Sequence, residues 1–99
     1  MPKLSVVIVS YNTRQLTLNC LASIKKTTDF ADLEVIVVDN ASTDKSVPTV
    51  KDQFPEVKMV QNKTNTGFAT ANNQGIKLAS GEYIMLLNSD TLVKPKAFQ

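Results

Sequence analysis

Apolar, strand-like runs alternate with helix-like segments along this chain, and that alternation constrains the fold more than any other feature. Three runs are almost continuously apolar, at 4–9, 33–38 and 82–87. Strands that are covered on both faces need such runs, which are typical of parallel sheets. A shorter run at 57–60 contains Lys58, so we expect it at an edge of the sheet.

The first two intervals between these runs have helical spacing. We expect a helix over about 13–28 with Asn12 as its N-cap. We expect a second helix that Ser42 caps and that holds Pro48 near its first turn, where proline costs least. The apolar faces of these two helices would bury Leu16, Cys20, Leu21 and Ile24, and Val47, Val50 and Phe54.

A third helix is expected over about 67–80. Gly75 lies inside it at a cost of about 1 kcal/mol relative to alanine, so we expect this glycine to permit close packing on the sheet. Gly81 is expected to end the helix as a left-handed C-cap. The spacing predicts burial of Phe68, Ala71, Gly75 and Leu78 or Ala79.

The resulting order of elements is β-α-β-α-β-α-β. Crossovers between parallel strands are right-handed, which places helices against the faces of the sheet. We therefore predict an α/β fold, with a three-layer, doubly wound, mainly parallel four-stranded sheet and helices on both faces. Residues 1–99 are expected to form one domain.

Composition excludes several classes of function. The 99 residues include no histidine and one cysteine, which excludes histidine acid–base chemistry, a disulfide framework and a cysteine-rich zinc site. The net charge is +2 and the basic residues are scattered, so no nucleic-acid partner is expected. The sequence shows neither an apolar run of membrane length nor a signal peptide, which predicts a cytoplasmic or cytoplasm-facing protein.

Polar residues collect after each predicted strand, at 10–12, 39–44, 61–67 and 88–90. The carboxyl ends of parallel strands lie along one edge of a sheet, where ligands bind, so these segments are expected to meet in one crevice. Helix N-termini there favour phosphate oxygens, and Asp90 suits an oxygen-ligated Mg²⁺ or Mn²⁺. The sequence has no G-x-G-x-x-G after its first strand and no P-loop motif, which disfavours dinucleotide and P-loop sites.

These polar segments carry a resemblance to a known family. Together with the strands before them, they resemble the N-terminal, donor-binding half of a family-two inverting glycosyltransferase, which has the GT-A nucleotide-sugar-binding fold. The resemblance covers nearly the whole chain, and its specificity comes from having all the pieces in order. The pieces are LSVVIVSYN at 4–12, LEVIVVDNASTD at 33–44, NTGFATANNQGI at 65–76 and GEYIMLLNSDT at 81–91.

The resemblance implies a role for residues after the first two strands. Ser10 and Tyr11 match positions that line the base pocket, and Asn12 follows them as a site residue or a helix cap. Asp39 matches the acid that hydrogen-bonds the base, although aspartate is also a common turn former. The next loop supplies Asn40 and Ser42, while Asp44 is interpreted as serving the dipole of the second helix.

The resemblance also implies roles nearer the C-terminus. Gly67 and Asn72 match a segment that lies against the ribose and diphosphate. Asn88-Ser89-Asp90 takes the place of the D-x-D motif, with Asp90 as the metal-binding acid for Mg²⁺ or Mn²⁺. Asn88 stands where many members have aspartate, so the cation would depend more on Asp90 and on the substrate phosphates. The N-x-D variant resembles the rhamnosyltransferase-like branch of the family.

The family's acceptor-binding half and catalytic base lie beyond the D-x-D segment, so we expect the base beyond Gln99 and no catalytic residue within the chain. The resemblance implies a UDP- or dTDP-sugar donor and, in the full enzyme, a glycan or lipid-linked sugar as acceptor. The full-length enzyme is expected in the cytoplasm or at the inner face of the membrane. Apolar residues of the last strand, at 83–87, would be left partly uncovered, which favours a homodimer.

A second hypothesis is a non-catalytic nucleotide-binding or regulatory module on the same scaffold, since fold alone does not fix function. A receiver domain is disfavoured because 10–12 supplies no acid at the end of the first strand. The sequence does not specify the sugar, the base, the linkage, the acceptor, the metal or the oligomeric state.

Overall fold

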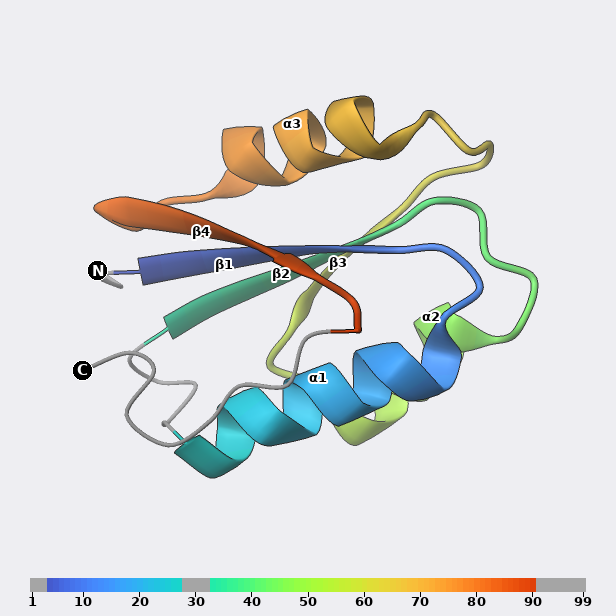
Figure 1. Ribbon diagram of the computed structural model, residues 1–99, viewed down its shortest axis with the longest axis horizontal. Helices are drawn as coiled ribbons and strands as arrows, with labels where there is room; N and C mark the ends of the chain where they lie inside the picture. Colours follow the sequence, from blue (N-terminus) through green and yellow to red (C-terminus); the bar gives the residue numbers. More distant parts are fainter. Residues whose placement is uncertain (1–3, 28–32, 91–99) are drawn as a thin grey trace.

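Parallel strands form one sheet between helices on both of its faces (Figure 1). The structure is a computed structural model, and it describes residues 4–27 and 33–90. The helices α1 and α2 cover one face, and α3 covers the other (Figure 1). The elements are β1 (Leu4–Ser10), α1 (Arg14–Thr27), β2 (Leu33–Asp39), α2 (Ser46–Gln53), β3 (Lys58–Gln61), α3 (Phe68–Leu78) and β4 (Tyr83–Asn88).

The four strands are parallel and lie in the order β3-β2-β1-β4. The predicted fold class is therefore confirmed, including the place of β3 at an edge. The two central strands, β1 and β2, are buried along almost their whole length because both faces are covered. Their continuous apolar runs fit this environment, where each buried Val or Ile side chain contributes about 1.5–3 kcal/mol.

Alternate residues of the central strands build the core on the two faces of the sheet. Val6 and Ile8 of β1 face the α1–α2 side, together with Cys20 and Ile24 of α1. Val7 of β1 faces the other side, where the buried core also contains Val9, Ile36, Val38 and Ala71. The predicted burial of the Val47, Val50 and Phe54 face of α2 is confirmed.

Two glycines are required by close approach to β1. A Cβ on Gly75 would lie 2.3 Å from Val7 Cγ1, which confirms the predicted packing of α3 on the sheet. The predicted left-handed cap at Gly81 is wrong, because α3 ends at Leu78 and Ala79 continues in an extended conformation. A Cβ on Gly81 would instead lie 2.7 Å from Ser5 Oγ and 2.8 Å from the Ser5 nitrogen.

The predicted helix caps are also wrong, because Asp44 binds the N-termini of both α1 and α2. Its Oδ2 accepts from the Arg14 N–H at 3.0 Å, and its Oδ1 accepts from the Ser46 N–H at 3.1 Å. Asn12 lies before the first turn of α1 and accepts from the Thr43 N–H instead, at 2.8 Å. Ser42 lies four positions before α2 and bonds Asp39.

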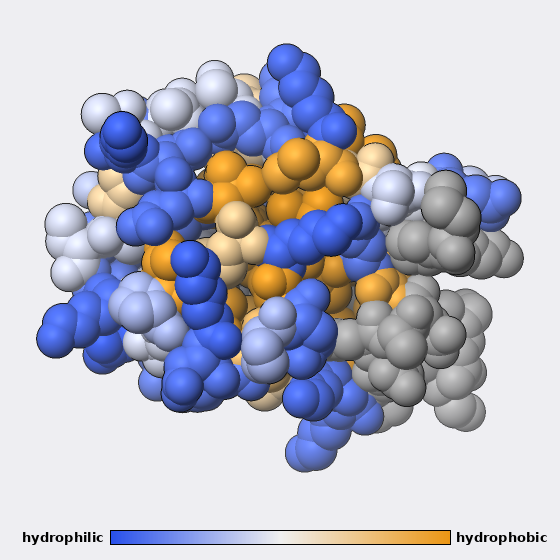
Figure 2. Space-filling model, turned by 180° about the vertical axis from the view of Figure 1, so that it is seen from behind, coloured by the Kyte–Doolittle hydropathy of each residue, from blue (hydrophilic) through white to orange (hydrophobic). Residues whose placement is uncertain are grey.

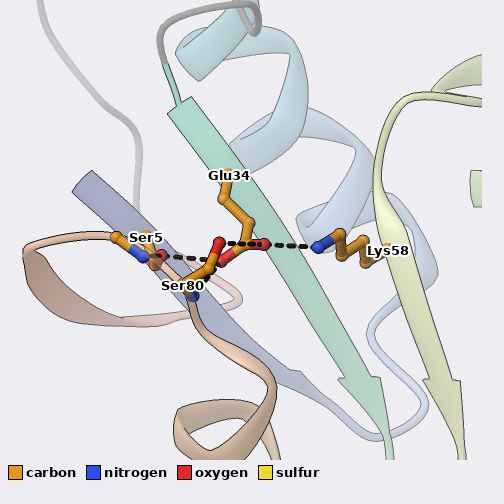
Figure 3. A network of polar contacts seen from close by, with 5 residues as sticks. Ser5, Glu34, Lys58 and Ser80 are labelled. Atoms are coloured by element: carbon orange, nitrogen blue, oxygen red, sulfur yellow. Dashed lines mark hydrogen bonds and ion pairs between the residues drawn. The ribbon is translucent and has the colours of Figure 1, made fainter. Parts of the chain in front are cut away.

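A buried carboxylate joins the amino ends of the strands (Figure 3). Glu34 Oε1 accepts from Ser5 Oγ at 2.7 Å and from the Ser80 N–H at 2.7 Å, and Lys58 pairs with Oε2. Burial alone raises the pKa of Glu34, but the Lys58 ammonium and the Ser80 and Ser5 bonds outweigh it and lower that pKa to about 2. The carboxylate is therefore charged at neutral pH and ties β1, β2 and β3 to the turn before β4.

The side of the molecule seen from behind is largely hydrophilic, with apolar surface gathered in its middle (Figure 2). On β3, Met59 and Val60 are half-buried while Lys58 and Gln61 are exposed. A short edge strand with a charged end discourages pairing with another chain.

Within the described ranges, no helix has both the length and the apolar character that crossing a membrane requires.

Candidate functional site

A pocket of about 390 Å³ opens at the carboxyl ends of β1 and β4. The chain runs outward from β1 through β2 to β3 and then returns to place β4 on the other side of β1. Ligands bind at such reversals in open α/β sheets. The pocket is lined by Val9, Tyr11, Thr13, Leu16, Asn40, Asn65, Phe68, Asn88, Ser89 and Asp90.

Two exposed aromatic side chains line this pocket. Tyr11 is 49% exposed in the loop after β1, and Phe68 is 58% exposed at the start of α3. The predicted burial of Phe68 is wrong because the first turn of α3 lies beside the pocket rather than on the core. Leu16 of α1, also expected in the core, is 45% exposed and lines the pocket as well. The site thus combines apolar ring surface with amide, hydroxyl and carboxylate groups.

The turn after β4 forms another part of the wall. Asn88 and Asp90 are exposed there, while Ser89 accepts a hydrogen bond from Thr13 Oγ1 at 3.0 Å. Thr13 also belongs to a hydroxyl cluster, with Ser10 Oγ at 3.2 Å and Thr17 Oγ1 at 3.2 Å. These bonds connect the end of β1 and the start of α1 to the turn that carries Asp90.

Ser10 and Asp39 lie beneath the surface rather than on the pocket wall. Each side chain is 1% exposed. Ser10 Oγ lies 3.0 Å from Thr17 Oγ1, and Asp39 accepts from the Ser42 N–H at 2.8 Å and from Ser42 Oγ at 2.6 Å. The structure therefore brings both predicted residues to the carboxyl edge of the sheet but engages both with the chain itself.

Asn40 and Gly67 meet beside the pocket. Asn40 Nδ2 donates to the Gly67 carbonyl at 3.1 Å, and Asn40 Oδ1 accepts from the Thr66 N–H at 3.2 Å. Gly67 has a φ of +86°, a conformation that side-chain-bearing residues rarely adopt, and α3 begins directly after it. Glycine is needed here for conformation, since a Cβ would have no atom within 4 Å.

Two other predicted site residues, Asn12 and Ser42, do not line this pocket and lie in the loops after β1 and β2. The Asn12 N–H donates to Ser42 Oγ at 2.9 Å, which joins the loops after β1 and β2. Ser42 lines a second hollow of about 540 Å³ between the loops after β2 and β3. This hollow is lined by Ala41, Ser42, Thr43, Gln61, Asn62 and Lys63.

Asn72 lies on α3, away from the pocket wall. It is 6% exposed, and its Oδ1 is buried without a hydrogen-bond partner in the part of the chain that the structure describes. A buried acceptor of this kind costs free energy unless a donor reaches it. Asn72 therefore lies away from the pocket, and no donor within residues 4–27 and 33–90 reaches its side-chain oxygen.

The oxygen donors at the pocket are of the chemical type that binds a hard divalent cation. Asp90 offers a carboxylate, Asn88 an amide oxygen and Ser89 a hydroxyl. Mg²⁺ is commonly held by one or two carboxylates together with substrate phosphates, so a small protein donor set suffices. No cluster of three or more histidine, cysteine or acidic residues occurs in the described ranges, and a metal here would need ligand oxygens to complete its coordination.

The buried thiol near this site is not a metal ligand. Cys20 is fully buried on α1, as predicted, and burial followed by the charge of Asp90 raises the pKa of the thiol to about 11. The protonated thiol is therefore a packing group.

Several lining residues were not predicted from the sequence as site residues. Asn65 was marked only as part of the polar segment at 61–67, and Thr13 was expected to begin the first helix. The helical spacing that assigned Phe68 and Leu16 to the core gives no information on where a helix extends past the sheet. An aromatic residue directly after a glycine at the start of a helix is the signal that could have marked Phe68.

Comparison with known proteins identifies the family. Residues 5–99 match the sequence model of Glycosyl transferase family 2. The chain belongs to this glycosyltransferase family. It is 38% identical over 95 residues to glycosyltransferase GlyG of Streptococcus pneumoniae, covering 92% of this chain and 31% of GlyG. It is 36% identical over 100 residues to poly(ribitol-phosphate) beta-glucosyltransferase of Bacillus spizizenii, covering 96% of this chain and 16% of that protein.

Solved structures agree with this family assignment. Residues 1–349 of S. aureus TarS in complex with UDP-GlcNAc give a TM-score of 0.81 at 32% identity, covering 89% of this chain and 26% of that one. Mannosyltransferase PcManGT from Pyrobaculum calidifontis, in complex with GDP-Man and Mn²⁺, gives a TM-score of 0.79 at 30% identity. The match covers 92% of this chain and 28% of PcManGT. The predicted GT-A fold is confirmed, and the glycosyltransferase chain spans under a third of these relatives.

Proposed function

We propose that this glycosyltransferase chain binds the nucleoside diphosphate of a UDP- or dTDP-sugar, together with a divalent metal, in the pocket at the ends of β1 and β4. The observation that carries the proposal is the meeting of an aromatic wall and the Asn88-Ser89-Asp90 turn in one pocket. Support comes from the family relatives whose structures contain UDP-GlcNAc or GDP-Man. We also propose that the chain belongs to the rhamnosyltransferase-like branch, a proposal that the N-x-D turn supports.

The base packs against Tyr11 in this proposal, because an exposed ring at a pocket wall provides a flat apolar face. Asp39 stays the acid assigned to the base, since a carboxylate has about four acceptor positions and Ser42 uses two of them. Hydrogen bonds made by Ser10, Asn12 and Ser42 hold the loops that carry Tyr11 and Asp39.

The diphosphate lies near the start of α3, where helix N–H groups and the dipole favour negative charge. Gly67 brings the backbone close to it without a side chain. Asn72 is 6% exposed and lies away from the pocket wall, so it is assigned no contact with the nucleotide. Asn88 and Asp90 hold Mg²⁺ or Mn²⁺, which when bound neutralises charge on the leaving diphosphate.

The full enzyme would transfer its sugar with inversion, using a carboxylate base to deprotonate the acceptor hydroxyl. Asp90 is the only carboxylate that lines the pocket among residues 4–27 and 33–90, and it is assigned to the metal. We therefore expect nucleotide binding without sugar transfer from the 99-residue chain. Transfer to a glycan or lipid-linked acceptor by the purified chain would refute this part of the proposal.

A calorimetric titration with UDP, dTDP and GDP, with and without Mn²⁺, tests the binding proposal. Tyr11→Ala should weaken binding roughly fivefold, the effect of losing a stacking contact of about 1 kcal/mol. Tyr83→Ala removes another exposed tyrosine at the opposite end of the sheet and is the matched control. Equal losses from both variants, or no binding of any nucleotide by the wild type, would contradict the proposal.

A further inference from the structure

We propose that Asn40 is a positioning residue, which holds Phe68 against the bound nucleotide through hydrogen bonds to the β3–α3 loop. Asn40 does not contact the nucleotide with its amide oxygen. This inference rests on the nucleotide-binding function proposed above, and it assigns a ligand contact to Phe68.

The side chain of Asn40 is occupied by the loop. It is 2% exposed, and its Nδ2 donates to the Gly67 carbonyl at 3.1 Å. Its Oδ1 accepts from Asn62 Nδ2 at 3.0 Å and from the Thr66 N–H and hydroxyl at 3.2 Å and 3.1 Å. An amide oxygen has two lone pairs, so three donors leave no acceptor capacity for a ligand.

The loop is fixed from both of its ends. The Asn62 N–H donates to the Asp39 carbonyl at 2.9 Å, and the Asn62 and Gln74 amides exchange two hydrogen bonds of 2.8 Å and 3.0 Å. At the far end, Asn65 Oδ1 accepts from the Gly67 N–H at 2.9 Å. Asn40 bonds Asn62 at the first end of this loop and Thr66 and Gly67 at its far end, so it joins the end of β2 to the start of α3.

Phe68 depends on this arrangement because its side chain is largely exposed. The residue follows Gly67 directly and is 58% exposed at the pocket. An exposed ring takes its place from the backbone that carries it, and here that backbone is bonded to Asn40. An aromatic ring on a polar pocket wall is a common device for contacting a flat ligand ring. Loss of Asn40 should therefore displace Phe68 and weaken nucleotide binding without removing any direct contact.

A double-mutant cycle on the full 99-residue chain tests this inference. UDP affinity is measured by calorimetry in saturating Mn²⁺ for Asn40→Ala, Phe68→Ala and the double variant. Each single variant should bind roughly tenfold more weakly. If Asn40 acts through Phe68, the double variant should also lose only about tenfold, because effects within one coupled unit are not additive. Additive losses, near a hundredfold in the double variant, would show that Asn40 acts independently of Phe68 and overturn the inference.

Two further variants separate positioning from general stability. Asn73→Ala removes an exposed asparagine from α3 and should leave UDP affinity unchanged. Thr66→Val removes one bond to Asn40 Oδ1 while leaving Asn40 in place, so it should weaken binding less than Asn40→Ala and should also be non-additive with Phe68→Ala. If Asn40→Ala does not fold, a double-mutant cycle of Thr66→Val with Phe68→Ala provides the same test. Absence of UDP binding in the wild type would refute the proposed function, whereas additive cycles in a wild type that binds UDP would refute this inference alone.

Discussion

At the scale of single residues, Ala41 occupies a backbone conformation that suits glycine. Its φ is +69°, in the loop between Asp39 and α2. The left-handed conformation costs an alanine about 1–2 kcal/mol, so Ala41→Gly should raise the free energy of unfolding by about 1 kcal/mol after glycine's own entropic cost. Urea denaturation measures the difference.

The control for this substitution is Ala22→Gly, at an exposed position within α1. Glycine in a helix costs about 1 kcal/mol relative to alanine, so this variant should shift stability in the opposite direction. A loss of stability from both substitutions would mean that the loop at Ala41 does not hold the conformation described.

Residue roles were harder to predict from sequence than residue positions. The polar residues after each strand do meet at one edge, because parallel strands end on the same side. Asn12 and Ser42 are typical cap residues by type, yet it is Asp44 that accepts from the first N–H of both neighbouring helices. The Arg14 N–H and Asp44 are 30 positions apart, and no local pattern reports such a partner.

At the scale of elements, the packing of α3 on β1 depends on Gly75. A Cβ there would lie 2.3 Å from Val7 Cγ1, so Gly75→Ala should lower the free energy of unfolding by about 1 kcal/mol or more despite alanine's better helix propensity. Val7→Ala in the same chain should recover part of this loss, since it removes the clashing methyl groups. Thr70→Ala, exposed on the same helix, is the control in urea denaturation.

Simple additivity of the Gly75 and Val7 substitutions would contradict this packing account. The double variant should lose less free energy of unfolding than the two single variants lose together, because the added methyl group fills space that the Val7 side chain leaves. Extra helical content without a change in stability would likewise mean that α3 lies farther from the sheet.

The Glu34 network predicts how stability depends on pH. The folded-state pKa of Glu34 is lowered to about 2 from 4.5, so its contribution is present above about pH 4.5 and is lost as the pH falls toward 2. As the pH falls from about 4.5 toward 2, the free energy of unfolding should therefore decrease by about 1–2 kcal/mol less in Glu34→Gln than in the wild type. This figure is discounted because Lys58 is largely exposed.

Chemical denaturation of Glu34→Gln across the acid range checks this prediction, with Glu82→Gln as an exposed control. A wild type and a Glu34→Gln variant with parallel pH profiles would mean that Lys58, Ser5 and Ser80 do not stabilise the charged carboxylate.

The elements themselves could be predicted because each depends on a local pattern. The apolar runs gave the parallel strands to within a residue or so, and β3 was placed at the edge by Lys58. Phe68 and Leu16 could not be placed, because helical spacing identifies one face of a helix and does not report which turns lie on the sheet. Gly81 was assigned to a cap because glycine's role there, close approach to Ser5, is non-local.

At the scale of the whole molecule, β4 leaves apolar side chains uncovered. Tyr83, Ile84 and Leu86 are exposed, and β4 pairs only with β1 among the described residues. We expect concentration-dependent self-association through this edge, because an exposed apolar strand can pair with another chain. Light scattering across a concentration series should show dimers for the wild type and fewer for Ile84→Lys, with Leu78→Lys on α3 as the control. A strictly monomeric wild type would contradict this expectation.

The central claim is that the carboxyl edge of the sheet binds a nucleoside diphosphate with a metal held at Asp90. The most direct measurement is the change in UDP affinity on adding Mn²⁺, compared by calorimetry for the wild type, Asp90→Asn and the exposed α2 control Asp52→Asn. The account predicts that Mn²⁺ tightens UDP binding in the wild type and in Asp52→Asn but has little effect in Asp90→Asn. An undiminished Mn²⁺ effect in Asp90→Asn would contradict it.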